Sequence, residues 1–159
     1  MDYLTLKTLH ILSMVLLFGT GLGSAFYKWM ADRSGVVAHI AVTNRHVVLA
    51  DWCFTTPTVI FQPLSGMWMA HLAGWPWSSG WIAASLLLYV LAGACWLPVV
   101  WLQIRMRDLS NTAVEHGSPL PTLYWRMAGW WFWLGVPAFT AMVAVVALMV
   151  FKHLPGGAA

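Results

Sequence analysis

The chain has 159 residues, of which 60% are hydrophobic and only 8% are charged, and its mean hydropathy is +0.73. A soluble domain averages about 25% charged residues, so this chain has too few charges to cover the surface of a soluble globule. Disorder is excluded by the same composition, because disordered chains combine low hydrophobicity with high charge. The composition therefore predicts an integral membrane protein. On such a protein a net charge of +3 indicates orientation in the membrane rather than nucleic-acid binding.

Four apolar segments are long enough to span a bilayer, because a spanning helix needs about 20 apolar residues. They lie at about 3–27, 47–73, 80–104 and 124–151. We predict an all-α fold, a polytopic membrane protein with a four-transmembrane-helix bundle that forms a single domain over residues 1–159. The first segment is expected to be retained rather than cleaved as a signal peptide, because it starts with Asp2 and its apolar part is too long.

The connections between these segments differ in charge and composition. Residues 28–44 are semi-polar with a helical pattern and would extend the second helix beyond the membrane, whereas residues 105–122 contain Gly117, Pro119 and Pro121 and are expected to be a loop. Positive residues lie near the first and third connections and are absent from the second: Lys28, Arg33, Arg45, Arg105, Arg107 and Arg126. By the positive-inside rule, both termini are expected on the outer (periplasmic) side.

His10 lies about two turns inside the first segment. A histidine within a bilayer either hydrogen-bonds to a neighbouring helix or binds a metal, as the usual axial ligand of haem iron. His71 and His153 are expected on the same side of the membrane, and either could supply a second axial ligand. Solvated histidines at the interface are the alternative for these two. Together with Met14 and Met67, His10 and His71 would also suit a soft metal such as copper(I), although methionines in membrane helices mostly serve packing.

One face of the second segment is polar through most of the membrane. Its residues are spaced alternately four and three apart: Asp51, Thr55, Thr58, Gln62, Ser65 and Met69. These side chains could hydrogen-bond between helices and to carbonyls that Pro57 and Pro63 leave without a donor. Alternatively, they could form a proton path or a polar wall for a cofactor. A carboxylate at the membrane needs a cation, and candidates for an ion pair with Asp51 lie at the same depth: Arg45, His46, Arg105 and Arg126.

Arg45 and Arg126 could hold negative groups, such as a haem propionate or a quinone, on the inner side. Solvated side chains are the alternative there. The sequence contains no nucleophile–base–acid grouping and no phosphate-binding loop, so hydrolysis and nucleotide chemistry are not expected.

The opening Lys7-Thr8-Leu9-His10-Ile11 resembles the first helix of HemJ-type protoporphyrinogen oxidases and of CopD-like membrane proteins, as do segments 134–137 and 150–152. A bacterial family of predicted integral membrane proteins of unknown function in the same broad group is more similar still. Its pattern is matched by segments 18–23, 50–52, 54–57, 92–100 and 102–103. This resemblance covers nearly the whole chain and implies a multi-pass protein of the bacterial inner (plasma) membrane.

The HemJ resemblance implies b-type haem bound through the first-helix histidine, here His10. HemJ-type proteins carry a lysine and a later histidine in the third helix, where this chain has Ser85 and Trp96. The resemblance therefore does not extend to porphyrinogen oxidation.

We therefore expect a protein that binds haem b and transfers electrons, to or from quinone or another respiratory partner. His10 would be one axial ligand, and His71 or His153 the other. Copper handling and a non-catalytic assembly or scaffold role are the alternatives. The sequence leaves open whether the protein is a haem-dependent membrane oxidoreductase and whether it forms homo-oligomers.

Overall fold

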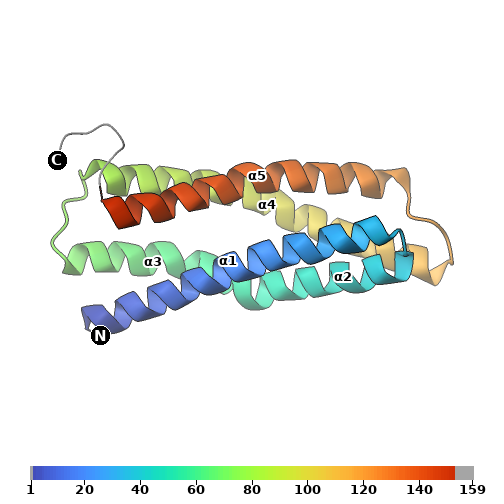
Figure 1. Cartoon of the computed structure of the whole chain (residues 1–159), viewed down its shortest axis with the longest axis horizontal. Helices are drawn as coiled ribbons and strands as arrows, with labels where there is room; N and C mark the ends of the chain where they lie inside the picture. The colour runs from blue at the N-terminus through green and yellow to red at the C-terminus, as the bar shows by residue number, and fades with distance from the viewer. Residues whose placement is uncertain (1, 153–159) are drawn as a thin grey trace.

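The computed structural model describes residues 2–152 and is helical along nearly all of this length. Figure 1 shows long helices lying side by side along one axis of an elongated bundle. In chain order the elements are α1 (Tyr3–Ser34), α2 (Val37–Ala50), the π-helix η1 (Asp51–Thr55), α3 (Thr56–Leu72), α4 (Gly80–Glu115) and α5 (Thr122–Phe151). The predicted all-helical fold is confirmed.

The segment from α2 to α3 forms one continuous rod, because the residues at both ends of η1 keep right-handed helical backbone angles. The π-helical turn ends two residues before Pro57, which has no backbone N–H to donate. Pro63, inside α3, removes the helical donor of the Val59 carbonyl. The Tyr89 hydroxyl of α4 donates to that carbonyl instead. The carbonyl that Pro63 leaves without a donor is thus bonded by the next helix, and not by a polar side chain of the second segment as the sequence suggests.

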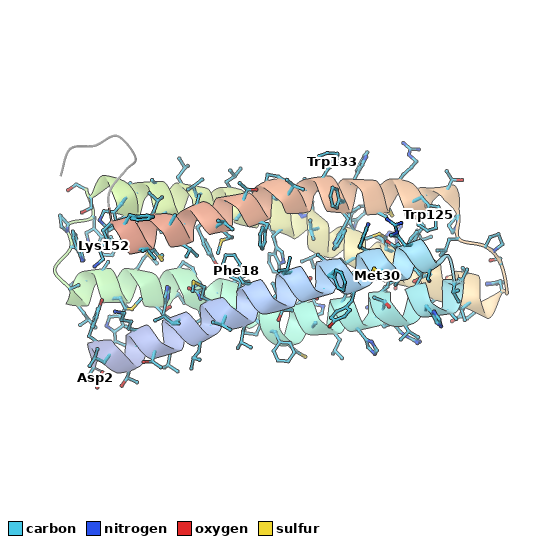
Figure 2. The ribbon with its side chains drawn as sticks, in the orientation of Figure 1. Asp2, Phe18, Met30, Trp125, Trp133 and Lys152 are labelled. Atoms are coloured by element: carbon cyan, nitrogen blue, oxygen red, sulfur yellow. The ribbon has the colours of Figure 1, made fainter. Side chains whose placement is uncertain are left out.

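Within residues 2–152, three helices are long and apolar enough to cross a membrane: α1, α4 and α5. The distribution of side chains fits a lipid environment, because large apolar residues cover the outside of the bundle; Leu4 and Leu87 are each 72% exposed. Trp133 likewise points away from the bundle (Figure 2). The interior instead contains many polar side chains: His10, Ser13, Lys28, Asn44, Asp51, Thr55, Thr58, Gln62, Ser65, Ser85, Gln103 and Ser110.

The expectation of a loop over residues 105–122 is wrong for its first part, because α4 continues to Glu115. This extension is helical because it is partly buried against α2. Met106 and Ser110 are fully buried, and the Asn44 amide of α2 donates a hydrogen bond of 3.1 Å to the Ser110 hydroxyl. The first helix likewise extends past residue 27, to Ser34. Polar composition alone did not distinguish a loop from a helix whose inner face is buried.

The helices pack closely at one end of the bundle and diverge toward the other. Helix α4 packs along α5 and against α2, while α1 packs against α2, η1 and α3. By contrast, α1 and α5 make few or no close backbone contacts with each other, and the same holds for α3 and α4. The α1–α2 and α4–α5 connections lie at the closely packed end, and the N-terminus lies at the other (Figure 1). This divergence leaves two cavities between the helices, and both contain polar side chains named above.

Candidate functional site

His10 lines the smaller cavity, which has a volume of about 70 Å³ and is walled by α1, α3, α4 and α5. The imidazole is only 6% exposed. Its Nδ1 lies 2.7 Å from the Ser65 hydroxyl of α3. The Gln62 amide donates a 3.0 Å hydrogen bond to the His10 backbone carbonyl, so α3 fixes both the ring and the backbone of this residue. The sequence-based alternative of a hydrogen bond between helices is therefore realised, but it uses only one ring nitrogen.

The hydrogen bonds of the Ser65 hydroxyl determine which tautomer the His10 imidazole adopts. The Ser65 hydroxyl donates its proton to the Phe61 carbonyl at 2.7 Å, so it accepts from the imidazole. Nδ1 must then carry the proton, which leaves the lone pair on Nε2. Metal-binding histidines are oriented in the same way, by donating the N–H of the other ring nitrogen to an oxygen. The arrangement therefore keeps Nε2 of His10 available as a ligand.

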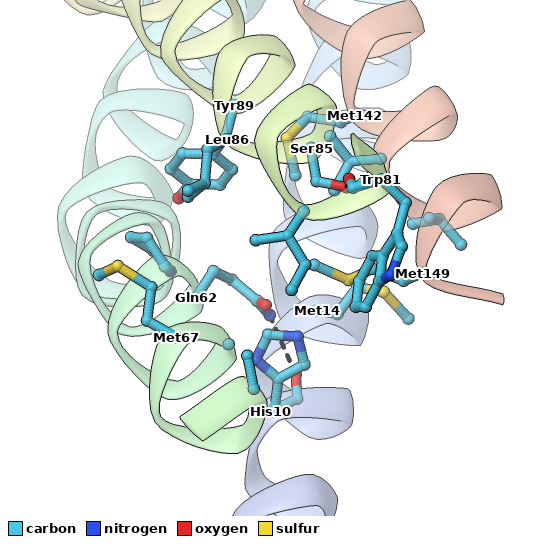
Figure 3. Close-up of a pocket in the computed structure, with 16 residues that line it drawn as sticks. His10, Met14, Gln62, Met67, Trp81, Ser85, Leu86, Tyr89, Met142 and Met149 are labelled. Carbon is cyan, nitrogen blue, oxygen red and sulfur yellow. Dashed lines mark hydrogen bonds between the residues drawn. The ribbon is translucent and has the colours of Figure 1, made fainter. Parts of the chain in front are cut away.

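Thioether side chains make up much of the remaining wall of this pocket. Figure 3 shows His10 together with Met14 of α1, Met67 of α3, and Met142 and Met149 of α5, all lining the same space. Within residues 2–152 no group of three or more His, Cys, Asp or Glu side chains could hold a metal ion. Besides the imidazole, the soft donor groups that line this pocket are therefore thioethers. Met142 and Met149 were missed by the sequence analysis, because only the fold brings α5 to this pocket.

The other predicted cofactor ligands do not gather around His10. His71 is exposed at the end of α3 and does not line the pocket, and His153 lies outside the described residues. Arg45 and Arg126 are also exposed, and neither lines either cavity. Their side chains project from the outer faces of α2 and α5, so the described structure does not place them where a bound group between the helices would need a cation.

The polar face of the second segment divides between the two cavities. Gln62 faces the His10 pocket, while Asp51 and Thr55 face the larger cavity. Thr58 lines neither: its hydroxyl lies 2.7 Å from the Phe54 carbonyl and 2.9 Å from the Thr55 carbonyl, next to the π-helical turn. The hydroxyl of Thr55 donates to Asp51 Oδ1 at 2.8 Å. Each of these groups thus has a local partner.

Asp51 is buried, and its carboxylate has no cation among residues 2–152, where the ion pairs are Lys28–Asp32 and Arg107–Asp108. The predicted ion pair with a neighbouring cation is not formed, because the candidate side chains are exposed on outer faces: Arg45, His46, Arg105 and Arg126. Asp51 instead faces a cavity of about 390 Å³ between α1, η1, α3, α4 and α5. Tyr89 and Met142 line both cavities, so the two adjoin.

A family model described as a predicted integral membrane protein (DUF2269) matches residues 4–153. The chain belongs to this family. The predicted membership in a family of integral membrane proteins is thereby confirmed. No curated protein and no solved structure matches the chain.

At the closely packed end of this DUF2269 protein, the structure reveals a polar cluster that sequence reasoning missed. The Lys28 ammonium, 1% exposed, donates to Asp32 Oδ2 and to the Tyr124 hydroxyl, each at 2.9 Å. The Tyr124 hydroxyl donates to Asp32 Oδ1 at 2.6 Å and accepts from Asn44 at 3.1 Å. Asn44 also donates to Ser110. This cluster, Lys28, Asp32, Asn44, Ser110 and Tyr124, joins α1, α2, α4 and α5. The feature of the sequence that could have indicated part of this cluster is the i, i+4 spacing of Lys28 and Asp32.

Proposed function

We propose that this membrane protein binds copper(I) in the His10 pocket and acts in the handling of that metal. The observation that carries the proposal is a buried imidazole, with Nδ1 bonded to Ser65, that lines one small pocket with four thioethers. Thioether and imidazole ligands suit soft copper(I), whereas carboxylates suit hard ions. No carboxylate of residues 2–152 lines this pocket. Neutral ligands add no charge of their own, so a monovalent ion leaves a smaller buried charge than a divalent one would.

Methionine side chains can adapt to an ion in this space. A thioether on an unbranched, flexible chain can turn toward a metal without a change in the backbone. Met14 and Met149 approach the pocket from α1 and α5, which otherwise make little contact there. Binding would therefore connect α1 with α5 at the end of the bundle where these helices diverge.

Haem b is the second candidate, and it rests on the resemblance of the first helix to HemJ-type proteins. His10 would be one axial ligand, and a pocket methionine could be the other, since His–Met pairs hold haem in some cytochromes. The 70 Å³ pocket is much smaller than a macrocycle, so haem would also have to occupy the adjoining 390 Å³ cavity. In the part of the chain that the structure describes, no Lys, Arg or His side chain lines that larger cavity to bind propionates. The donor set and the volume both favour copper, and an electron-transfer role with quinone depends on the haem alternative.

We also infer four membrane spans, with the rod of α2, η1 and α3 as the second. Helix α3 alone has 17 residues, but its continuation through η1 into α2 supplies the length that a span needs. Lys28 and Arg33 lie near the C-terminal end of α1, and Arg107 lies in the last third of α4. The connections that follow these two helices lie at the closely packed end, which we assign to the cytoplasmic side. Both termini would then face the periplasm of a bacterial inner membrane. Cysteine labelling of each end in intact cells tests this assignment.

The test of function is metal binding by the purified protein in mild detergent. Copper(I) supplied under reducing conditions, in competition with a chromophoric chelator, should bind at one ion per chain. The paired variant Met14→Leu/Met149→Leu should weaken binding at least tenfold while keeping the apolar volume. Met69→Leu, on α3 but outside the pocket, is the matched control and should bind as the original protein does. A b-type optical band after haem-replete expression, without copper binding, would favour haem instead.

A further inference from the structure

The larger cavity has the chemistry of a ligand site that is separate from the His10 pocket. Its volume is about 390 Å³, and one carboxylate, Asp51, lies among its lining residues. No Lys, Arg or His side chain of the described residues lines it. Aromatic rings form much of the wall: Phe18, Tyr89, Trp96, Trp131, Phe132 and Phe139. In Figure 2, Phe18 projects from α1 toward the other half of the bundle, where its ring lies 5.6 Å from that of Phe139.

Two polar atoms of this wall also lack partners. The Gln103 side chain is 6% exposed, and its Oε1 atom is buried with no hydrogen-bond donor in the described structure. The Gln103 side chain approaches the Asp51 carboxylate. Trp131 Nε1 is buried and likewise has no acceptor within residues 2–152. A buried polar group without a partner costs about 1–3 kcal/mol, so a ligand that donates hydrogen bonds to Asp51 and Gln103 would remove part of this cost.

The buried lysine, Lys28, does not form an ion pair with Asp51. Lys28 Nζ lies 5.5 Å from the centroid of the Trp131 ring, but its charge is already paired with Asp32. The other titratable side chain lining the cavity, Tyr89, donates its proton to the Val59 carbonyl. Among the described residues, Asp51 therefore supplies the only carboxylate of this cavity, and it faces aromatic rings whose π-surfaces attract cations.

Glycines on three helices keep the cavity open. Gly21 of α1, Gly93 of α4 and Gly135 of α5 all line it, and a Cβ atom built on any of them would meet nothing within 4 Å. Any larger side chain at these positions could project into the space. Their small size leaves room for a ring system beside the aromatic wall.

We propose that this cavity binds a lipophilic organic ammonium ion, with its N–H groups on Asp51 and Gln103 and its apolar part against the aromatic wall. The ammonium charge compensates the carboxylate. Its N–H groups supply a donor to Gln103 Oε1, which has none in the described structure, and a further donor to Asp51 beside that of Thr55. When Asp51 is protonated in the empty protein, binding of the cation releases that proton to solvent. The proposal does not depend on a metal at His10.

Calorimetric titration of the protein in lipid nanodiscs with 1-naphthylmethylammonium tests this proposal. The neutral isostere 1-naphthylmethanol is the comparison ligand. We expect the ammonium to bind at least tenfold more tightly than the alcohol, and its affinity to rise with pH as the Asp51 proton is lost. Titration in buffers of different ionisation enthalpy measures the released proton. Equal affinities of the two compounds would overturn the proposal, because they would mean simple partition into an apolar space.

Variants separate the carboxylate from the cavity itself. Asp51→Asn should abolish both the preference for the ammonium and the pH dependence, whereas Asp108→Asn, at an exposed carboxylate paired with Arg107, should preserve both. Gly135→Leu should block binding of both compounds by filling the cavity, and thermal unfolding shows whether it remains folded. His10→Ala should leave binding of the ammonium unchanged, even if copper binding is lost. An Asp51→Asn protein that keeps the preference for the ammonium contradicts the proposal.

Discussion

The two ends of the bundle use buried polar residues in opposite ways. At the closely packed end, Lys28, Asp32 and Tyr124 satisfy one another with hydrogen bonds of 2.6–2.9 Å. Where the helices diverge, His10 lines one cavity with a ring nitrogen available, and Asp51 lines the other without a cation. Polar networks with every member bonded hold helices in place, whereas groups without partners mark sites at which something else binds. We therefore infer a structural role for the first end and propose ligand binding for the second.

The largest effect is expected from breaking the ion pair at the closely packed end. Lys28→Met removes the cation and leaves the Asp32 carboxylate and the Tyr124 hydroxyl without it. We expect the free energy of unfolding in detergent to fall by about 3 kcal/mol, the lower end of the range for breaking a buried pair, because the Asp32 side chain is still 17% exposed. Arg107→Met, at the exposed pair with Asp108, should change the free energy of unfolding by less than about 1 kcal/mol. If the two variants lower the free energy of unfolding equally, the Lys28 cluster stabilises the bundle no more than the Arg107–Asp108 pair does.

Next in size is the loss of the hydroxyl at the centre of this cluster. Tyr124→Phe keeps the ring but removes the group that links Asp32 to Asn44. Hydrogen bonds to charged groups contribute about 1.5–3 kcal/mol, and because Lys28 and Asp32 still bond each other, we expect a loss near 1.5 kcal/mol. Tyr27→Phe, at a residue that is 67% exposed, is the control for thermal unfolding and should have no measurable effect. If Tyr124→Phe and Tyr27→Phe unfold at the same temperature, the Tyr124 hydroxyl does not stabilise the fold.

The difference between the two ends also decides what the sequence could predict. Helical periodicity and the position of Pro63 were enough to predict helices and a carbonyl that needs a donor. Isolation of His10 within an apolar segment was enough to single it out. The Lys28 cluster could not be predicted, because Lys28 and Tyr124 are 96 residues apart and a single sequence does not show which helices adjoin. The cavities depend on how far the two halves diverge, which residue patterns do not encode.

At the diverging end, the hydroxyl that orients His10 should affect metal affinity more than stability. Ser65→Ala removes the acceptor of the His10 Nδ1 proton, so the ring loses its fixed tautomer and orientation. Loss of such a partner typically costs 10–100-fold in metal affinity, and we expect copper(I) binding to weaken within that range. Ser85→Ala is the matched control, since Ser85 lines the same pocket but bonds to the Trp81 carbonyl of its own helix. If both variants bind copper(I) equally well, Ser65 does not orient a ligand.

The smallest effect is expected in the larger cavity, and its sign is the informative part. Glycine inside a helix is less favourable than alanine by about 0.8–1 kcal/mol, and a Cβ atom on Gly93 would meet nothing within 4 Å. Gly93→Ala should therefore raise the free energy of unfolding by up to about 1 kcal/mol, as measured by unfolding in detergent. A lower stability would mean that α4 packs tightly at this position in the membrane and that the cavity is closed. Because a closed cavity could not hold an ammonium ion beside Asp51, this small change tests whether the diverging end is open.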